Sequence, residues 1–312
     1  MKRGSLITVA MVAASVGLSG YTGQEPPVAT FKSGVDLVRV AAVVRDHKGR
    51  FVQDLSAKDF EILEDGREQR ITDFKHDLAS VSVAVLFDVS GSMEGHLASA
   101  REEAAHVLSW LDPHDEAAIF TFDTQLQEVT PFAEGVKTLP QAMTTVVPFG
   151  ATSLHDAIAQ TAQRAGQREG RRRGVVVLTD GNDNASRLSP DRVSAIASAI
   201  DVPVYVVGIV PSIDNPNADT ATMSAERSAL EGPLTDLANW TGGHLFVAST
   251  PAQRSNAARQ IIDELRHQYL LAFESSGRPG WHPLEVRARQ KNLIVRARAG
   301  YVAGQSRPSD DK

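Results

Sequence analysis

The spacing of hydrophobic positions changes near residue 80. From there to residue 250, continuous apolar runs alternate with segments whose apolar residues recur every three or four positions. Such runs are typical of strands buried on both faces, and the helical spacing predicts amphipathic helices. We therefore expect an α/β fold, a doubly wound and mostly parallel sheet with helices on both faces. The expected strands are 81–87, 117–122, 175–178, 202–210 and 244–248, and the expected helices 96–111, 137–146, 153–165, 190–200 and 229–240.

Both flanks of this region have patterns of short β-strands. Residues 33–76 alternate apolar and polar positions, with a turn signal at 47–49, a single helical turn expected at 56–59 and a hairpin turn at Asp65-Gly66. After residue 250 come a long amphipathic helix, 252–268, and strands expected at 269–275, 283–289 and 293–301. Because isolated hairpins are marginally stable, we expect the two flanks to join in one small β-sandwich.

The N-terminal twenty residues have the pattern of a secretory signal. Lys2 and Arg3 precede an apolar run over 6–18, and small residues follow it. The run is short for a bilayer span, so an uncleaved anchor is the lesser alternative. Tyr21 stands where a lipoprotein signal needs cysteine, which excludes lipidation there. We expect a secreted or periplasmic protein with no stable membrane span after cleavage.

The predicted organisation has six parts. They are a signal peptide at 1–20, a linker at 21–32, an N-terminal β unit at 33–76, the α/β domain at 79–250, a C-terminal helix and strands at 251–303, and a disordered tail at 304–312. Within the α/β domain, the polar segment 212–228 predicts a mobile surface loop. The three arginines at 171–173, flanked by glycines, are interpreted as a solvated loop.

Composition narrows the possible chemistry. The 312-residue chain is 42% hydrophobic and 22% charged, which allows a full core. Its formal charge of −6 falls to −8 without Lys2 and Arg3, so nucleic acid is not an expected partner. The chain has no cysteine, which rules out disulfides, thiolate metal sites and a cysteine nucleophile.

Oxygen-bearing side chains follow several of the predicted strands. Asp88, Ser90 and Ser92 end the first strand, Thr152 precedes a helix, and Asp180 ends the strand at 175–178. Ligands of a doubly wound sheet bind beyond the carboxyl ends of its strands, where the strand order reverses. The five side chains should therefore share one crevice. Three hydroxyls and two carboxylates suit a hard cation, with Mg²⁺ first, Mn²⁺ or Ca²⁺ possible, and Zn²⁺ poorly matched.

The series Asp88-x-Ser90-x-Ser92, Thr152 and Asp180-Gly resembles the metal-ion-dependent adhesion site of von Willebrand factor type A (VWA) domains, over about residues 79–250. The flanking DLSAKDFEILEDG, TGGHLF, QYLLAF and RARAGY segments resemble those of the bacterial, acidobacterial-type VWFA-related proteins. His155 departs from the family, because an aromatic residue such as tyrosine is expected there.

The resemblance implies a binding module rather than an enzyme. The two serines and the threonine would lie close to the metal, and one or both acids would act through water. One coordination position would remain open for an exposed Asp or Glu of a protein ligand. The metal-binding residues implied are Asp88, Ser90, Ser92, Thr152 and Asp180.

Three alternatives remain beside this interpretation. In the first, the protein is a structural or assembly factor that binds partners through its β flanks, and the metal only stabilises loops. In the second, it is a Mg²⁺-dependent phosphatase of the haloacid dehalogenase type, but Ser90 stands where that chemistry needs a second acid. A serine hydrolase would need a G-x-S-x-G nucleophile turn, which the sequence lacks.

Overall fold

Six strands form the central sheet of the computed structural model, which describes residues 37–77, 79–199, 201–210, 230, 232–275 and 277–303. The strand order is β10-β9-β8-β5-β6-β7, and every pair is parallel except β6 with β7. This confirms the expected doubly wound, mostly parallel sheet. The strands are β5 (Val81–Asp88), β6 (Glu116–Phe122), β7 (Leu126–Glu134), β8 (Arg172–Thr179), β9 (Val204–Ile209) and β10 (Leu245–Ala248).

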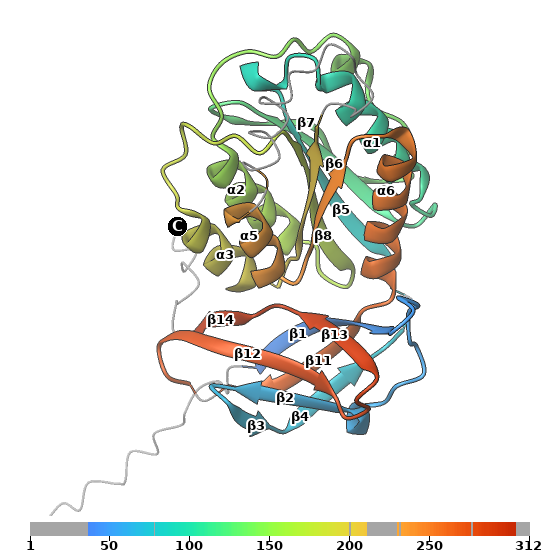
Figure 1. Ribbon diagram of the computed structural model, residues 1–312, viewed down its shortest axis with the longest axis vertical. Coiled ribbons are helices and arrows are strands. Elements are labelled where there is room, and N and C mark those ends of the chain that lie inside the picture. Colours follow the sequence, from blue (N-terminus) through green and yellow to red (C-terminus); the bar gives the residue numbers. More distant parts are fainter. Residues whose placement is uncertain are drawn as a thin grey trace, which may run out of the picture. The chain divides into compact units, whose positions relative to one another are not determined.

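Helices cover both faces of this sheet (Figure 1). One face carries α1 and α6, and the other carries α2, α3 and α5. Strand β5 shows why its sequence is apolar throughout, since Val83 and Val85 pack on the first face and Ala84 and Leu86 on the second. The helices are α1 (Leu97–Ser109), α2 (Leu154–Gly166), α3 (Pro190–Ala199), α5 (Pro233–Trp240) and α6 (Pro251–Arg266).

The flanking strands form a β-sandwich of two four-stranded sheets, ordered β13-β1-β11-β4 and β14-β12-β2-β3 (Figure 1). Each sheet pairs strands from before the α/β region with strands from after it, which confirms that the two flanks join. The strands are β1 (Leu37–Asp46), β2 (Phe60–Glu64), β3 (Arg67–Gln69), β4 (Ile71–Lys75), β11 (Tyr269–Glu274), β12 (Gly280–Ala288), β13 (Leu293–Ala297) and β14 (Gly300–Ala303). The expected helical turn is the 3₁₀ turn η1 (Ala57–Asp59).

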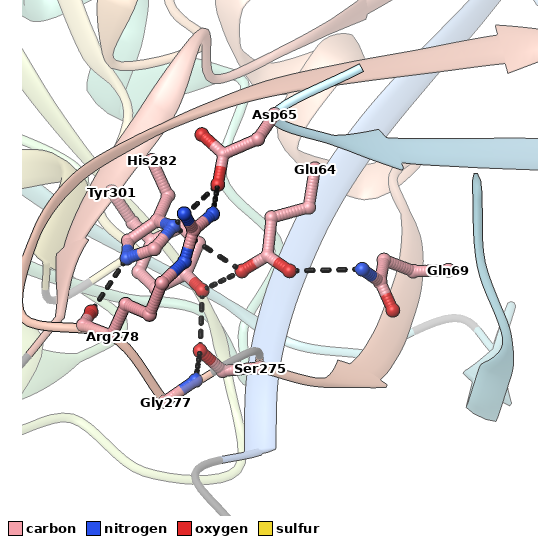
Figure 2. A network of polar contacts seen from close by, with 8 residues as sticks. All are labelled: Glu64, Asp65, Gln69, Ser275, Gly277, Arg278, His282 and Tyr301. Carbon is pink, nitrogen blue, oxygen red and sulfur yellow. Dashed lines mark hydrogen bonds and ion pairs between the residues drawn. The ribbon is translucent and has the colours of Figure 1, made fainter. Parts of the chain in front are cut away.

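A polar network lies inside the sandwich (Figure 2). The carboxylate of Glu64, only 1% exposed, accepts hydrogen bonds from the hydroxyl of Tyr301 and, at 2.9 Å, from Nε2 of Gln69. The Tyr301 hydroxyl lies 2.6 Å from Oγ of Ser275, and the Tyr301 ring stacks on His282. Burying a carboxylate destabilises the folded state unless hydrogen bonds satisfy its oxygens. These contacts satisfy Glu64, and the bond from Tyr301 also links β14 to β2.

Three sequence interpretations are wrong in detail. The helix expected at 137–146 is only a 3₁₀ turn, η3 (Gln141–Thr144), and the antiparallel edge strand β7 before it was not expected. The arginines at 171–173 are not a solvated loop, because β8 begins at Arg172, which is 3% exposed and pairs with Asp77 at 3.2 Å. The segment expected as one strand at 293–301 is interrupted at 298–299, and its halves, β13 and β14, belong to different sheets.

Several predictions concern residues outside the described part of the chain. They are the signal peptide at 1–20, the linker at 21–32, the loop at 212–228 and the tail at 304–312, and they stay predictions. Among the described residues, no helix combines the length and apolar character that crossing a membrane requires.

Candidate metal centre

The strand order reverses between β5 and β8. These two parallel strands pair with each other, and the chain continues from β5 to β6 on one side and from β8 to β9 on the other. Asp88 ends β5, and Thr179 and Asp180 lie at the end of β8. The two predicted acids therefore follow neighbouring strands at the carboxyl edge of the sheet, as the sequence led us to expect.

Asp88 has both carboxylate oxygens engaged by hydrogen bonds. Its Oδ1 accepts from the backbone N–H of Ser90 at 3.0 Å and from the Ser90 hydroxyl at 2.6 Å, while Oδ2 accepts from the Thr179 hydroxyl at 2.6 Å. Burial raises the pKa of Asp88 to about 6, and the charge of nearby Asp180 adds to the rise, although the hydrogen bonds oppose it. Asp88 thus fixes the orientation of the Ser90 and Thr179 hydroxyls.

The two serines lie side by side after β5. Ser90 precedes the 3₁₀ turn η2 (Gly91–Met93), and its hydroxyl oxygen is 3.1 Å from that of Ser92. Ser90 is fully buried, whereas Ser92 is exposed. A side chain at Gly91 would approach the carbonyl oxygen of Gly150 to 3.3 Å, so glycine permits the close contact between the two loops. The two hydroxyls therefore form a pair with one exposed member.

Backbone hydrogen bonds attach the loop before α2 to residues 89–92, here called the serine loop. Gly91 N–H donates to the carbonyl oxygen of Gly150 at 3.0 Å, and Phe149 N–H donates to that of Val89 at 2.9 Å. Gly150 has a positive φ of 84°, a conformation that favours glycine. These contacts place the start of α2, and with it Thr152, at the same edge as the serines.

Thr152 and Asp180 belong to loops that bind each other. The backbone N–H of Thr152 donates to Oδ1 of Asn184 at 2.9 Å, and its carbonyl oxygen accepts from Asn184 N–H at 3.0 Å. Asp180 accepts from the backbone N–H and side-chain amide of Asn182, at 3.1 and 3.0 Å. Thr152 and Asp180 are both buried. Direct hydrogen bonds thus unite Asp88, Ser90 and Ser92, and Thr152 and Asp180 join them through the backbones of their loops.

His155 has a specific partner in the second loop. Its Nδ1 lies 2.7 Å from Oδ2 of Asp183, and its backbone N–H donates to the same oxygen at 2.9 Å. Burial alone would raise the pKa of Asp183, but the hydrogen bonds from His155 and Ser186 outweigh it and hold that pKa well below its usual range. The histidine at the position expected to be aromatic is therefore held by polar contacts with Asp183.

Sequence reasoning missed three residues that support this arrangement, Thr179, Asp183 and Asn184. Asp183 and Asn184 accept hydrogen bonds that fasten the loop after β8 to the start of α2. Their proximity to Asp180 could have indicated this role, because Asp and Asn side chains readily accept backbone hydrogen bonds in loops. Thr179 gave no signal, since a threonine at the end of an apolar run is typical of any strand.

The chemistry of this donor set fits a hard divalent cation. Three hydroxyls and two carboxylates supply only oxygen, which suits Mg²⁺, Mn²⁺ or Ca²⁺. The carboxylates are only two, and the described residues contain no group of three or more His, Asp or Glu side chains suited to a metal. A cation here would therefore need hydroxyl oxygens as well as carboxylates among its ligands.

The family assignment follows from a direct match. The family model described as von Willebrand factor type A domain matches residues 82–258, more than half of the chain. The chain belongs to the VWA family. The matched segment of this VWA protein contains all five residues of the predicted site. No curated protein matches the sequence.

Several solved structures resemble the VWA protein. They include an aerotolerance-related membrane protein from Bacteroides fragilis (18% identity, 60% of this chain and 98% of that chain, TM-score 0.48). A von Willebrand factor type A protein from Catenulispora acidiphila shares 12% identity over 87% and 76% of the two chains, with a TM-score of 0.45. The manganese-loaded TRAP protein of Plasmodium vivax shares 15% over 78% and 100%, with a TM-score of 0.40. Likeness at this level indicates nothing about ligands or partners.

Proposed function

We propose that this chain is a protein-interaction module that binds a divalent cation at its VWA site and uses it to hold an acidic residue of a protein partner. VWA domains are generally adhesion or interaction modules rather than enzymes. The proposed metal residues are Asp88, Ser90, Ser92, Thr152 and Asp180. Mg²⁺ is the first candidate, and Mn²⁺ or Ca²⁺ would also suit the oxygen donors.

The observation that carries this proposal is the double engagement of Asp88. Because Oδ1 and Oδ2 already accept hydrogen bonds from Ser90 and Thr179, the carboxylate is suited to orient the serine hydroxyls and to act on a cation through water. Neutral direct ligands would leave the cation with uncompensated positive charge. A carboxylate brought by another molecule would supply the missing negative charge at the open position.

Calorimetric titration of the full chain with Mg²⁺ and Mn²⁺ tests the metal site. Ser92→Ala removes an exposed hydroxyl and Asp180→Ala removes an acid, and both should weaken binding at least about tenfold while the circular dichroism spectrum is retained. Ser109→Ala, an exposed serine at the other end of α1, is the matched control and should bind as the wild type does. Equal affinity in all four proteins would contradict the assignment.

Chelation separates the binding role from its rivals. With EDTA the fold should persist and the binding of acidic ligands should be lost. Loss of the fold would instead favour the structural role in which the metal only holds loops together. Mg²⁺-dependent hydrolysis of a generic phosphate ester, abolished by Asp88→Asn, would favour the phosphatase alternative.

We further infer that the protein acts outside the cytoplasm. The support is the sequence pattern of Lys2, Arg3 and the apolar run 6–18, with small residues after it. Expression of the full chain with its own N-terminus in a bacterial host should give exported protein that begins near Tyr21. N-terminal sequencing of the exported fraction that still reads from Met1 would contradict this.

A further inference from the structure

Two large apolar side chains beside the proposed metal centre are unusually exposed. Phe149 is 80% exposed and Val147 is 77% exposed, more than any other large hydrophobic side chain of the described residues. Both belong to the segment between η3 and Thr152, and Pro148 separates them. Single exposed hydrophobic residues are common on protein surfaces, but two on one short loop next to a polar site call for an explanation.

The loop is firmly held, so its exposure does not result from lack of anchorage. The guanidinium group of Arg101 on α1 donates to the carbonyl oxygens of Met143 at 2.7 Å and Val146 at 2.9 Å. On the other side of the apolar pair, Phe149 N–H and Gly150 C=O are bonded to the serine loop. With its backbone fixed before and after the pair, the loop presents both side chains to solvent in a prearranged position.

The same bonds place the pair next to the proposed cation. Phe149 N–H binds the carbonyl oxygen of Val89, the residue between Asp88 and Ser90, and Gly150 binds Gly91. The loop that exposes the two apolar side chains is therefore bonded directly to the loop that carries Asp88, Ser90 and Ser92. A cation attracts any carboxylate without regard to its neighbours, whereas an adjoining apolar surface favours carboxylates that have an apolar neighbour.

We propose that the partner of this site is a protein segment in which a large apolar side chain lies within about three positions of the coordinating Asp or Glu, and that this side chain packs on Val147 and Phe149. The inference rests on the proposed function, because it specifies the partner of the same metal site. The cation provides the charge interaction, and Val147 and Phe149 provide selectivity by removing apolar surface from water.

Selection from a phage-displayed library of random peptides on the immobilised full chain in Mg²⁺ tests this proposal. Phages that EDTA releases should carry Asp or Glu with an enriched large apolar residue within three positions. On the V147S/F149S variant the acid should remain enriched and the apolar preference should disappear. I294S is the matched control, because Ile294 is a large apolar residue that is 64% exposed on β13 of the sandwich. Peptides selected on the I294S variant should match those selected on the wild type.

The released peptides, made synthetically, give a quantitative measure. A selected peptide should bind the V147S/F149S variant at least about tenfold more weakly than the wild type, since much of one buried aromatic contact is lost. Mg²⁺ affinity without peptide should be equal in both proteins, because the substitutions leave the oxygen donors in place. I294S should bind the peptide as the wild type does.

The outcomes distinguish this inference from the function on which it rests. Acidic peptides released by EDTA without apolar enrichment would overturn the inference and leave the metal-dependent function standing. Apolar peptides retained in EDTA would also overturn it, because the loop would then bind independently of the metal. If EDTA released no acidic peptides at all, the proposed function would fail, and the inference with it.

Discussion

The hydroxyl of Thr179 donates a 2.6 Å hydrogen bond to Oδ2 of Asp88, joining the ends of β8 and β5 where the strand order reverses. The same hydroxyl accepts from the backbone N–H of Gly181 at 3.0 Å. Thr179 therefore positions both the acid at the end of β5 and the loop that carries Asp180. It contributes to the proposed centre without belonging to the expected motif.

Thr179→Val should weaken both stability and metal binding. The change keeps the shape but leaves a buried carboxylate oxygen of Asp88 and the N–H of Gly181 without this partner, at a cost of about 1–3 kcal/mol. Because Asp88 would orient the serine hydroxyls less well, Mg²⁺ affinity should fall roughly tenfold or more. Urea unfolding and calorimetric titration measure the two effects.

Thr161→Val is the matched control for this substitution. Thr161 is fully buried in α2, and its hydroxyl has no hydrogen-bond partner among the described residues. Its replacement should leave stability unchanged or slightly higher and should not affect Mg²⁺ affinity. Similar losses in both variants would mean that Thr179 serves only packing.

Much of this centre was predictable because its signals are local. An apolar run that ends in Asp88, Ser90 and Ser92 marks a buried strand with its polar donors at one edge. The role of Thr179 was not predictable, because it depends on the pairing of β5 with β8, which aligns Phe87 with Leu178. Only the assembled sheet shows that the next residue along β8 faces the acid.

The departures in the fold have different origins. Pro131, Pro140 and Pro148 punctuate the segment that contains β7 and η3, and they leave no room for the helix expected at 137–146. Arg172 is buried where β8 pairs with β5 beside Val81, and its guanidinium group pairs with Asp77, far away in the sequence. Neither the pairing of an edge strand nor a distant ion pair leaves a periodic trace in the sequence.

Glu103 should make the protein less stable as the pH rises toward neutrality. It lies fully buried on α1, and neither carboxylate oxygen has a hydrogen-bond partner among the described residues. Burial raises the pKa of Glu103 to about 8 from 4.5, although the charge of Arg254 opposes the shift. Between these values the unfolded chain releases a proton that the folded chain keeps, so stability falls by up to about 1.4 kcal/mol per pH unit.

Glu103→Gln should remove this dependence. As the pH rises from 4.5 to 8, the free energy of unfolding of the variant should increase relative to that of the wild type, and at pH 7 the variant should be the more stable protein. Urea unfolding across this pH range measures the difference. Glu102→Gln is the neighbouring control, because the Glu102 side chain is 57% exposed, and its difference from the wild type should not follow this trend. A constant difference between the Glu103 variant and the wild type would show that Glu103 ionises normally.

Tyr301→Phe should destabilise the sandwich. The Tyr301 hydroxyl donates to the buried carboxylate of Glu64 (Figure 2), and burial together with this bond raises the pKa of Tyr301, so the hydroxyl keeps its proton at neutral pH. Removing the donor should cost about 1–3 kcal/mol in urea unfolding. In a Glu64→Gln background the cost should be smaller, because the remaining bond lacks charge assistance. Equal costs in both backgrounds would show that the two residues are not coupled.

Gly243→Ala should be more damaging than any of these changes, because the backbone of Val204 occupies the space of the new methyl group. An added Cβ would overlap the carbonyl oxygen of Val204 and lie 2.5 Å from its carbonyl carbon. This close approach lets the Thr241 hydroxyl accept from Val204 N–H at 3.0 Å, so the TGGHLF segment aligns β9 with the turn before β10. We expect a loss of at least about 3 kcal/mol, measured by urea unfolding. Gly170→Ala is the control, because an added Cβ there would meet nothing within 4 Å. It should cost only the strain of the positive φ, about 1–2 kcal/mol. A Gly243 variant no less stable than this control would mean that β9 and β10 separate easily.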